Sequence, residues 1–160
     1  MIFVTTGTHY LPFDRLLKMV DLLVKNLIIT EEIVIQSGTS TMQVQNAKLI
    51  PFLSYQEMIK HIAKARLVIT AAGPATVFQV LTYGKNLPVV VPRIKKYGEH
   101  VSDHQLYFAK YLSERSLCKL ILSSDDLIKC YKNAEKVMDK RSSFPSEKLI
   151  TNLDKYLSVQ

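Results

Sequence analysis

The sequence lacks the features that mark secreted and membrane-spanning proteins. None of its 160 residues lies in an apolar run near the roughly 18 residues that cross a bilayer, so no membrane-spanning helix is expected. Its two cysteines, Cys118 and Cys130, lack the paired CxxC spacing of metal and redox sites, so we expect reduced thiols and no bound metal. No basic segment followed by a long apolar one stands at the start, so we expect no signal peptide and a cytoplasmic location.

Acidic residues are the scarcer charged class. There are 14 Asp and Glu residues against 21 Lys and Arg residues, which gives a formal net charge of +7. That surplus suits anionic partners such as nucleic acid, acidic phospholipid or phosphorylated small molecules. Nucleic acid is not expected as a partner, because no cluster of aromatic residues lies among the basic ones to form a stacking platform.

Segments typical of strands and of helices alternate along the chain. The expected strands cover residues 2–6, 32–36, 49–50, 67–70, 87–91 and 118–122. The expected helices cover residues 12–27, 55–64, 75–83, 102–115, 124–139 and 146–157, with Pro12 opening the first, Ser54 and Glu57 capping the second, Gly84 ending the third and Ser102 capping the fourth. This alternation predicts an α/β fold with a doubly wound parallel sheet, in a single domain over residues 1–160.

Two glycine turns follow expected strands. The first, Thr5-Thr-Gly-Thr-His9, contains Gly7 and Thr8, and the second, Thr70-Ala-Ala-Gly-Pro-Ala-Thr76, contains Gly73. In an open parallel sheet, ligands bind at the carboxyl ends of the strands, where the start of the next helix offers unpaired N–H groups to a phosphate. Each turn also has a simpler interpretation, a tight connection without a ligand. Neither has the GxGxxG spacing of dinucleotide sites, so no nicotinamide cofactor is expected, nor any other.

The segment from Pro92 to Gln105 is the richest in polar side chains. It follows the most apolar expected strand and contains three cations, two histidines, two carboxylates and one amide. Such density at the carboxyl end of a strand suits a sugar or phosphate site. A solvated basic loop before a capped helix is the alternative interpretation, and it accounts well for Lys95 and Lys96.

Four motifs follow one another between residues 70 and 105. The glycine turn of residues 70–76 is followed by Gln79, then by Gly84-Lys-Asn-Leu-Pro-Val-Val-Val-Pro92 and then by Asp103-His-Gln105. This order resembles the donor-binding signature of glycosyltransferase family 28, whose members have the GT-B fold. That signature has a Thr-His-Gly-Gly-like turn, a helix with an acidic residue, a Gly-Lys-x-x-x-Val-Val-Pro segment and an Asp-x-Gln motif.

Other segments resemble the short, split members of this family. They are residues 3–9 with Pro12, Phe13 and Arg15, then residues 36–38, 52–55 and 96–100. The resemblance covers residues 1–128 in order. One kind of split relative is the soluble catalytic subunit of the eukaryotic transferase that adds the second GlcNAc to dolichol-linked precursors. The other is its bacterial counterpart in capsule and exopolysaccharide assembly, which this chain resembles more closely.

The resemblance implies a Rossmann-like half of a GT-B enzyme, a hexosyltransferase that inverts the anomeric carbon of a UDP-sugar without a metal. It also implies roles for individual residues. Those at the diphosphate are Gly7, Thr8, Gly73, Pro74, Ala75 and Thr76, supported by Arg93 or Lys96. Gln79 is expected at the ribose, and Asp103, His104 and Gln105 at the sugar. His9 is the candidate general base, unless a partner supplies that group.

Three positions depart from the family pattern. Ala71 stands where the family has the turn histidine, and Ala75 where it has a turn glycine. Gln79 stands where relatives have the glutamate that holds the ribose hydroxyls. An amide binds a hydroxyl without the charge assistance of a carboxylate. A non-catalytic enhancer subunit of a partner glycosyltransferase is therefore the alternative function.

A second polypeptide is expected to complete the enzyme. A GT-B active site lies between two Rossmann-like domains, and about six expected strands suit only one of them. The resemblance implies a lipid-linked saccharide acceptor, held by a membrane-anchored subunit that recruits this chain to the inner face of the cell membrane. The expected docking surface lies near His9 and the loop from Arg93 to His100, together with the helix that begins at Ser146.

Overall fold

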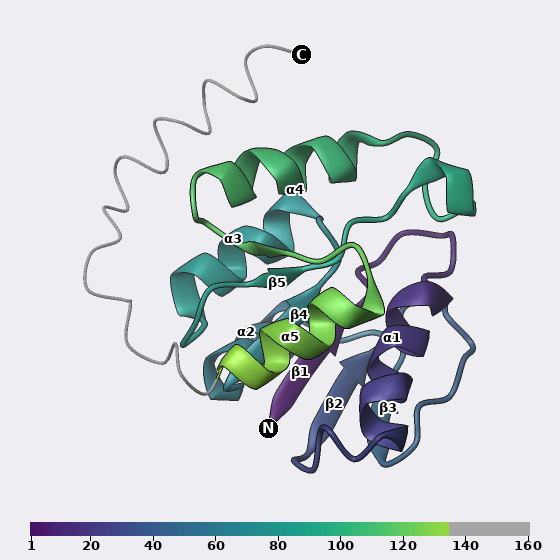
Figure 1. Ribbon diagram of the computed structural model, residues 1–160, viewed down its shortest axis with the longest axis vertical. Coiled ribbons are helices and arrows are strands. Elements are labelled where there is room, and N and C mark those ends of the chain that lie inside the picture. Colours follow the sequence, from purple (N-terminus) through teal and green to yellow (C-terminus); the bar gives the residue numbers. More distant parts are fainter. Residues whose placement is uncertain (135–160) are drawn as a thin grey trace.

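The computed structural model describes residues 1–134, in which six strands form one wholly parallel sheet (Figure 1). The strands are β1 (Ile2–Thr5), β2 (Ile33–Gln36), β3 (Ala47–Ile50), β4 (Leu67–Thr70), β5 (Val89–Val90) and β6 (Lys119–Leu120). Their spatial order is β3-β2-β1-β4-β5-β6. The chain therefore builds outward from β1 in one direction and then from β4 in the other. This confirms the doubly wound, Rossmann-like α/β fold that the alternation predicted.

The central strands are buried on both faces. Every residue of β1, β2 and β4 is buried, and Val4 lies in register between Ile35 and Ile69. Such continuous apolar strands are typical of parallel sheets covered by helices on both sides, because no strand face meets water.

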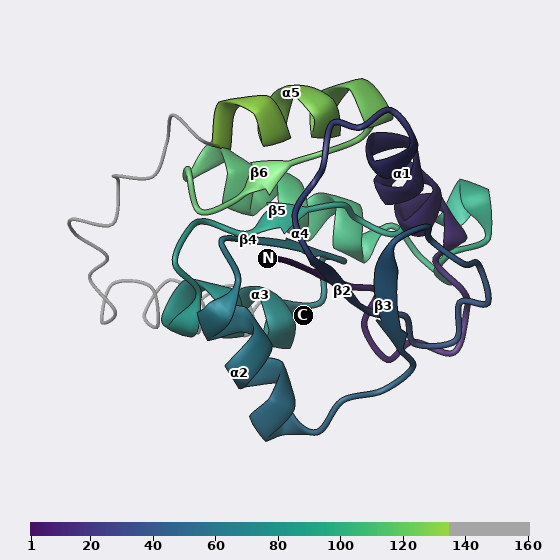
Figure 2. The same ribbon diagram turned by 90° about the horizontal axis from the view of Figure 1, so that it is seen from below.

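Five α-helices within residues 1–134 cover the sheet, and Figure 2 shows α1 and α5 on one side with α2 and α3 on the other. Their bounds are α1 (Asp14–Lys25), α2 (Tyr55–Lys64), α3 (Pro74–Tyr83), α4 (His104–Glu114) and α5 (Ser124–Ala134), and a 3₁₀ turn, η1, spans Lys95–Tyr97. The α1 and α5 layer packs on the sheet face that carries Ile2 and Val4. The opposite layer packs on Phe3 and Val34, and α4 joins it where Phe108 meets Phe78 edge to face.

Helix α2 has the bounds that the sequence predicted. The Ser54 side chain accepts a hydrogen bond from the Glu57 backbone N–H, and the Glu57 carboxylate accepts one of 2.8 Å from the Ser54 backbone N–H. This reciprocal pairing satisfies two N–H groups that the helix start leaves without partners.

Two expected helix starts are wrong. Helix α1 begins at Asp14, not at Pro12, because the carbonyl oxygens of Leu11 and Pro12 accept hydrogen bonds from the Arg93 side chain. Ser102 does not cap α4, which begins at His104, since the Ser102 hydroxyl lies instead between the Nδ1 atoms of two histidines, His100 and His104.

Other boundaries also differ from the sequence prediction. Helix α1 ends at Lys25, and Leu27 takes a left-handed φ of 53° with its side chain exposed. Strand β5 is reduced to Val89 and Val90. Gly84 ends α3 as expected, but through close packing, since a Cβ at this position would lie 2.7 Å from the Val80 carbonyl oxygen.

Two sequence predictions lie outside the described residues. They are the helix over residues 146–157, with its docking role from Ser146, and the part of the helix over 124–139 that follows Ala134. No helix in the described part of the chain is both long and apolar enough to span a membrane.

Candidate functional site

The carboxyl ends of β1 and β4 form the switch point of the sheet. These two strands are neighbours, and the chain leaves β1 toward β2 but leaves β4 toward β5. The connections that follow them therefore diverge to opposite faces. The place where they part, here called the crevice, is where open α/β sheets bind ligands. The two glycine turns of the sequence are the connections after these two strands.

The turn after β1 is held by the buried side chain of Gln36. Its Nε2 donates to the carbonyl oxygens of Gly7 and Pro51, at 3.2 and 2.9 Å, and its Oε1 accepts from the Thr5 hydroxyl at 2.5 Å. Gly7 itself has a φ of +78°, a conformation that glycine adopts without steric cost. The turn is therefore fixed from β2, and Thr8, at its tip, is exposed.

The turn after β4 leads straight into a helix start. Gly73 precedes α3, and Pro74 occupies its first turn. Gly73 has an ordinary φ of −73°, and a Cβ built there would meet no atom within 4 Å. Neither backbone conformation nor packing in the described chain requires a glycine at this position. The space beside it leaves room for a ligand at the positive end of the helix dipole.

Residues of α3 continue this surface. Pro74 and Ala75 are exposed, while Thr76 and Gln79 are partly buried. Thr76 and Gln79 are three residues apart, so they lie on one side of the helix. Gln79 forms no hydrogen bond with another described residue, so its amide is available to a ligand.

Arg93 is buried in the crevice wall, only 1% exposed. Its Nη1 donates to the carbonyl oxygens of Leu11, Pro12 and Glu99, and its Nη2 donates to that of Thr6. Burial lowers the pKa of Arg93 to about 10, which Glu99 partly opposes, so the guanidinium is charged at neutral pH. Sequence reasoning placed this residue at a diphosphate, but here its hydrogen bonds join the loop after β1 to the segment after β5.

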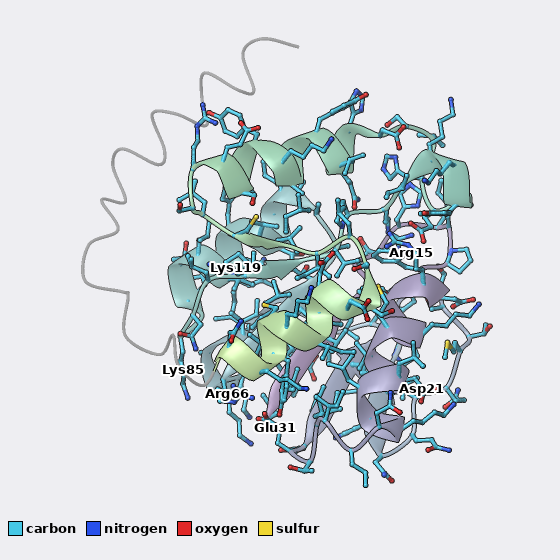
Figure 3. All side chains as sticks on the ribbon, viewed as in Figure 1. Arg15, Asp21, Glu31, Arg66, Lys85 and Lys119 are labelled. Carbon is cyan, nitrogen blue, oxygen red and sulfur yellow. The ribbon has the colours of Figure 1, made fainter. Side chains whose placement is uncertain are left out.

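A partly buried ion pair fixes the same segment from α1. Arg15 donates through Nε and Nη2 to the two carboxylate oxygens of Glu99, at 2.7 and 2.9 Å, and Nη2 also donates to the Pro92 carbonyl oxygen. The Glu99 carboxylate further accepts from the Ile94 backbone N–H at 2.9 Å. Figure 3 shows Arg15 at one end of the sheet, opposite the end where Glu31 and Arg66 pair.

Asp103 and Gln105 act mainly on the backbone of this segment. The Asp103 carboxylate accepts from the Lys95 backbone N–H at 2.8 Å, and the Gln105 side-chain oxygen accepts from the Arg93 backbone N–H at 3.1 Å. The Gln105 Nε2 has no partner among the described residues, so it remains a donor at the crevice. His104 is exposed at the start of α4.

The basic side chains of η1 point outward. Lys95 and Lys96 are exposed, and the Lys96 ammonium lies 4.8 Å from the centre of the Tyr97 ring. The solvated interpretation of these two lysines therefore fits their positions. Lys96 and Arg93 therefore differ in role, because Lys96 faces solvent whereas Arg93 is buried.

His9 lies beside His100, with ring centres 4.6 Å apart. The Nδ1 of His9 accepts a hydrogen bond from the Leu11 backbone N–H at 3.2 Å, so the neutral ring carries its proton on Nε2. Burial, then His100 and Arg93, lower the pKa of His9 below its usual value, which favours the neutral ring. In this arrangement the ring is a donor, and it becomes a general base only if Nδ1 releases the Leu11 N–H.

The predicted residues thus divide into two groups. The glycine turns, Gln79, His9 and His104 line the carboxyl edge, whereas Arg93, Asp103 and the Gln105 oxygen hold the loop that frames it. Sequence reasoning missed the organising roles of Gln36, Arg15 and Glu99. The segments that contain them were noted for their family resemblance, but nothing in a local pattern pairs Arg15 with a residue 84 positions later.

A cavity of about 630 Å³ lies away from this edge. It is lined by Leu67 at the start of β4, Leu87 before β5 and Cys118 before β6, and it reaches Cys130 of α5. Because these residues lie toward the amino ends of the strands, the cavity is not at the switch point. Among residues 1–134, no three His, Cys, Asp or Glu side chains gather closely enough to hold a metal ion.

The chain matches one known protein family over most of its length. Residues 1–155 match the profile of the glycosyltransferase family 28 C-terminal domain. Among solved structures, MurG from Acinetobacter baumannii is similar, with a TM-score of 0.60 and 22% sequence identity over 86% of this chain and 42% of that chain. A flavodoxin-like domain from Synechococcus sp. matches with a TM-score of 0.44 and 13% identity, over 84% of this chain and 93% of that domain. The chain spans less than half the length of the MurG chain that it matches. No curated protein sequence matches significantly.

Proposed function

Because the chain belongs to the glycosyltransferase family 28 C-terminal domain family, we propose that it binds the UDP-sugar donor of a two-component glycosyltransferase. One observation carries this proposal. The two glycine turns that the sequence singles out lie side by side at the switch point of the sheet, where this class of fold binds its ligands.

The donor diphosphate belongs at the start of α3. The open space beside Gly73 lets the diphosphate approach the backbone, and the N–H groups of Ala75 and Thr76 lie in the first turn, where no helix carbonyl pairs with them. When the sugar leaves, negative charge grows on the diphosphate, and preorganised N–H groups at a helix start stabilise it. Gly7 and Thr8 border the crevice from the β1 side.

Gln79 is the residue for the ribose. It lies on the same side of α3 as Thr76, and its amide is uncommitted in the described chain. The sugar belongs near α4, where the Gln105 amide nitrogen and exposed His104 offer donors, with Asp103 acting through the loop backbone. Arg93 supports the site by positioning both loops, and Lys96 adds an exposed positive charge outside them.

The complete enzyme needs a second domain, which we assign to a membrane-anchored subunit. The chain spans 42% of the MurG structure that it resembles, and its described residues build one Rossmann-like sheet. In this proposal the chain is a single nucleotide-sugar-binding domain at the inner membrane face. The partner presents a lipid-linked saccharide acceptor, and the reaction inverts the anomeric carbon during exopolysaccharide or capsule synthesis. Because His9 presents a donor, we assign the general base to the partner.

A non-catalytic enhancer subunit is the second candidate. It is favoured by Ala71, Ala75 and Gln79, which replace a histidine, a glycine and a glutamate of the family signature. Donor binding separates the two candidates, because an enhancer acts through its partner without holding the nucleotide sugar.

Calorimetry with UDP and UDP-sugars, with and without the partner subunit, tests the proposal. We expect binding of UDP and of at least one UDP-sugar, and sugar transfer only when the partner is present at the membrane. If neither state binds any nucleotide sugar, the catalytic proposal is wrong and the enhancer function takes its place. Full transfer by the purified chain alone would contradict the two-component assignment.

A further inference from the structure

Three of the four histidines of the chain gather on two facing loops. His9 lies in the loop after β1, His100 lies between η1 and α4, and His104 is the first residue of α4. The rings of His9 and His100 are 4.6 Å apart, and the Ser102 hydroxyl lies 3.3 Å from the Nδ1 of His100 and 3.1 Å from that of His104. The remaining histidine, His61, stacks on Phe3 on another part of the molecule.

The two closest rings are held in the same tautomer. The His9 Nδ1 accepts from the backbone N–H two residues later, and the His100 Nδ1 does the same with the Ser102 backbone N–H, each at 3.2 Å. A neutral imidazole whose Nδ1 accepts carries its proton on Nε2. The pair therefore presents two Nε2–H donors, and neither has a hydrogen-bond partner among residues 1–134.

The charges around this pair favour an anion. Arg93 is a buried cation close enough to lower the pKa of His9, together with burial and His100. The nearest buried carboxylate, Glu99, is already paired with Arg15, and the Asp103 carboxylate accepts from the Lys95 backbone N–H. Tyr10 stacks on the His9 ring, with ring centres 4.6 Å apart, and adds no carboxylate to the site.

We propose that His9 and His100 form a paired donor site for a phosphate group. Two N–H donors from facing loops fit two oxygens of one phosphate, and hydrogen bonds to such an oxyanion are stronger than those between neutral groups. Both loops are fixed by Arg93, so the site is preorganised without ligand. Its place in the reaction rests on the proposed function, because either the donor or the lipid-linked acceptor supplies a diphosphate.

Imidazole nitrogen spectra of the intact chain test the pair directly, with inorganic pyrophosphate as the probe. We expect the Nε2 signals of His9 and His100 to shift on titration at neutral pH, and the pKa of His9 to rise at saturation. His61 is the internal control, and its signals should stay in place. Unmoved signals of His9 and His100, or an equal shift of His61, would overturn the proposal.

Single replacements measure what each ring contributes. His9→Phe and His100→Phe each keep a ring in place but remove its Nε2–H donor, so each should weaken pyrophosphate binding about tenfold, the loss of one hydrogen bond to a charged group. His61→Phe is the matched control and should leave the affinity unchanged. Amide spectra verify that each variant is folded. If a variant does not fold, the imidazole nitrogen spectra of the unaltered chain test the proposal on their own. Equal affinity of all folded variants would contradict the pair.

Two further ligands identify the source of the phosphate. If UDP displaces pyrophosphate from the pair, the site holds the donor's diphosphate. If a short-chain prenyl diphosphate shifts the pair while UDP is already bound elsewhere, the site holds the acceptor's. If UDP binds but neither UDP nor pyrophosphate shifts the signals of the two rings, the proposed function stands and this phosphate site is refuted. If pyrophosphate shifts the signals of the pair but no nucleotide sugar binds, the phosphate site stands and the proposed function is refuted.

Discussion

The Nη2 of Arg93 donates a hydrogen bond of 2.9 Å to the carbonyl oxygen of Thr6, which joins the loop after β5 to the loop after β1. Figure 1 shows these two loops side by side at the carboxyl edge of the sheet. The same guanidinium also donates, through Nη1, to the carbonyl oxygens of Leu11, Pro12 and Glu99. The crevice therefore keeps its shape through a charged side chain that is itself buried.

Replacing Arg93 should lower the stability of the fold itself, whether or not a ligand is present. Arg93→Met removes every one of these donors and leaves buried carbonyl oxygens unpaired, so we expect a loss of about 3 kcal/mol in the free energy of unfolding. Lys96→Met is the control, and the exposed position of Lys96 predicts a change within about 0.5 kcal/mol. Denaturant unfolding measures both. Equal stability of the two variants would show that the buried hydrogen bonds contribute little.

Gly73→Ala should separate stability from ligand binding. The backbone φ of −73° suits alanine, and its Cβ would meet no atom, so the free energy of unfolding should change by less than about 1 kcal/mol. UDP affinity should fall, because the added methyl group occupies the space assigned to the diphosphate. Calorimetry and denaturant unfolding report the two effects separately.

Gly38→Ala is the contrasting variant for the stability measurement, at a position where the structure does require a glycine. A Cβ at Gly38 would lie 2.6 Å from the Gly7 carbonyl oxygen, and φ is +58°, so this variant should lose stability at a position away from α3. If Gly73→Ala binds UDP as the unaltered chain does, the diphosphate does not approach this turn.

Gln79 should respond to charge at the ribose position. Gln79→Ala should weaken UDP binding by about 0.5–1.5 kcal/mol, the contribution of one hydrogen bond, while Gln79→Glu should preserve or strengthen it. Thr82→Ala, at an exposed position of the same helix, serves as the control. Unchanged affinity in both Gln79 variants would place the ribose elsewhere.

Glu31 should stabilise the fold in a pH-dependent way at the opposite end of the sheet. Burial alone raises its pKa, but hydrogen bonds from Arg66 and the amino terminus outweigh burial and hold the pKa below its usual value. A depressed carboxyl pKa stabilises the folded state above the unfolded pKa of about 4.3, and this stabilisation is lost as pH falls through the lower folded value.

Glu31→Gln tests this pH dependence. The variant should be less stable by about 2 kcal/mol at pH 7, and the difference should shrink as the solution becomes acidic. Unfolding curves between neutral and strongly acidic pH measure it. A difference that stays constant over that range would contradict the role of the Glu31 charge.

Much of the fold could be predicted from the sequence because its signals are local. Apolar runs identify the buried strands, and the reciprocal pairing of Ser54 with Glu57 sets the start of α2 within four residues. The glycine turns were placed correctly at the ends of β1 and β4. The strand order then brings the two turns together, which the positions of the residues in the chain do not show.

The site was less predictable because its framework is made of long-range contacts. Arg93 has the chemistry of a phosphate ligand, and only the folded chain shows that four backbone carbonyl oxygens accept its hydrogen bonds. Ser102 has the chemistry of a helix cap, yet it lies between two imidazoles. Arg93 therefore binds backbone groups distant in the sequence instead of a phosphate, and Ser102 contacts two nearby rings instead of capping α4.

Amide NMR titration with UDP tests most directly whether a nucleotide sugar binds between the ends of β1 and β4. We predict that the backbone signals of residues 6–9 and 73–77 shift together and saturate at one affinity, while those around the cavity near Cys118 and Cys130 do not move. Shifts confined to that cavity, or no saturable shift at either glycine turn, would contradict donor binding at this edge of the sheet.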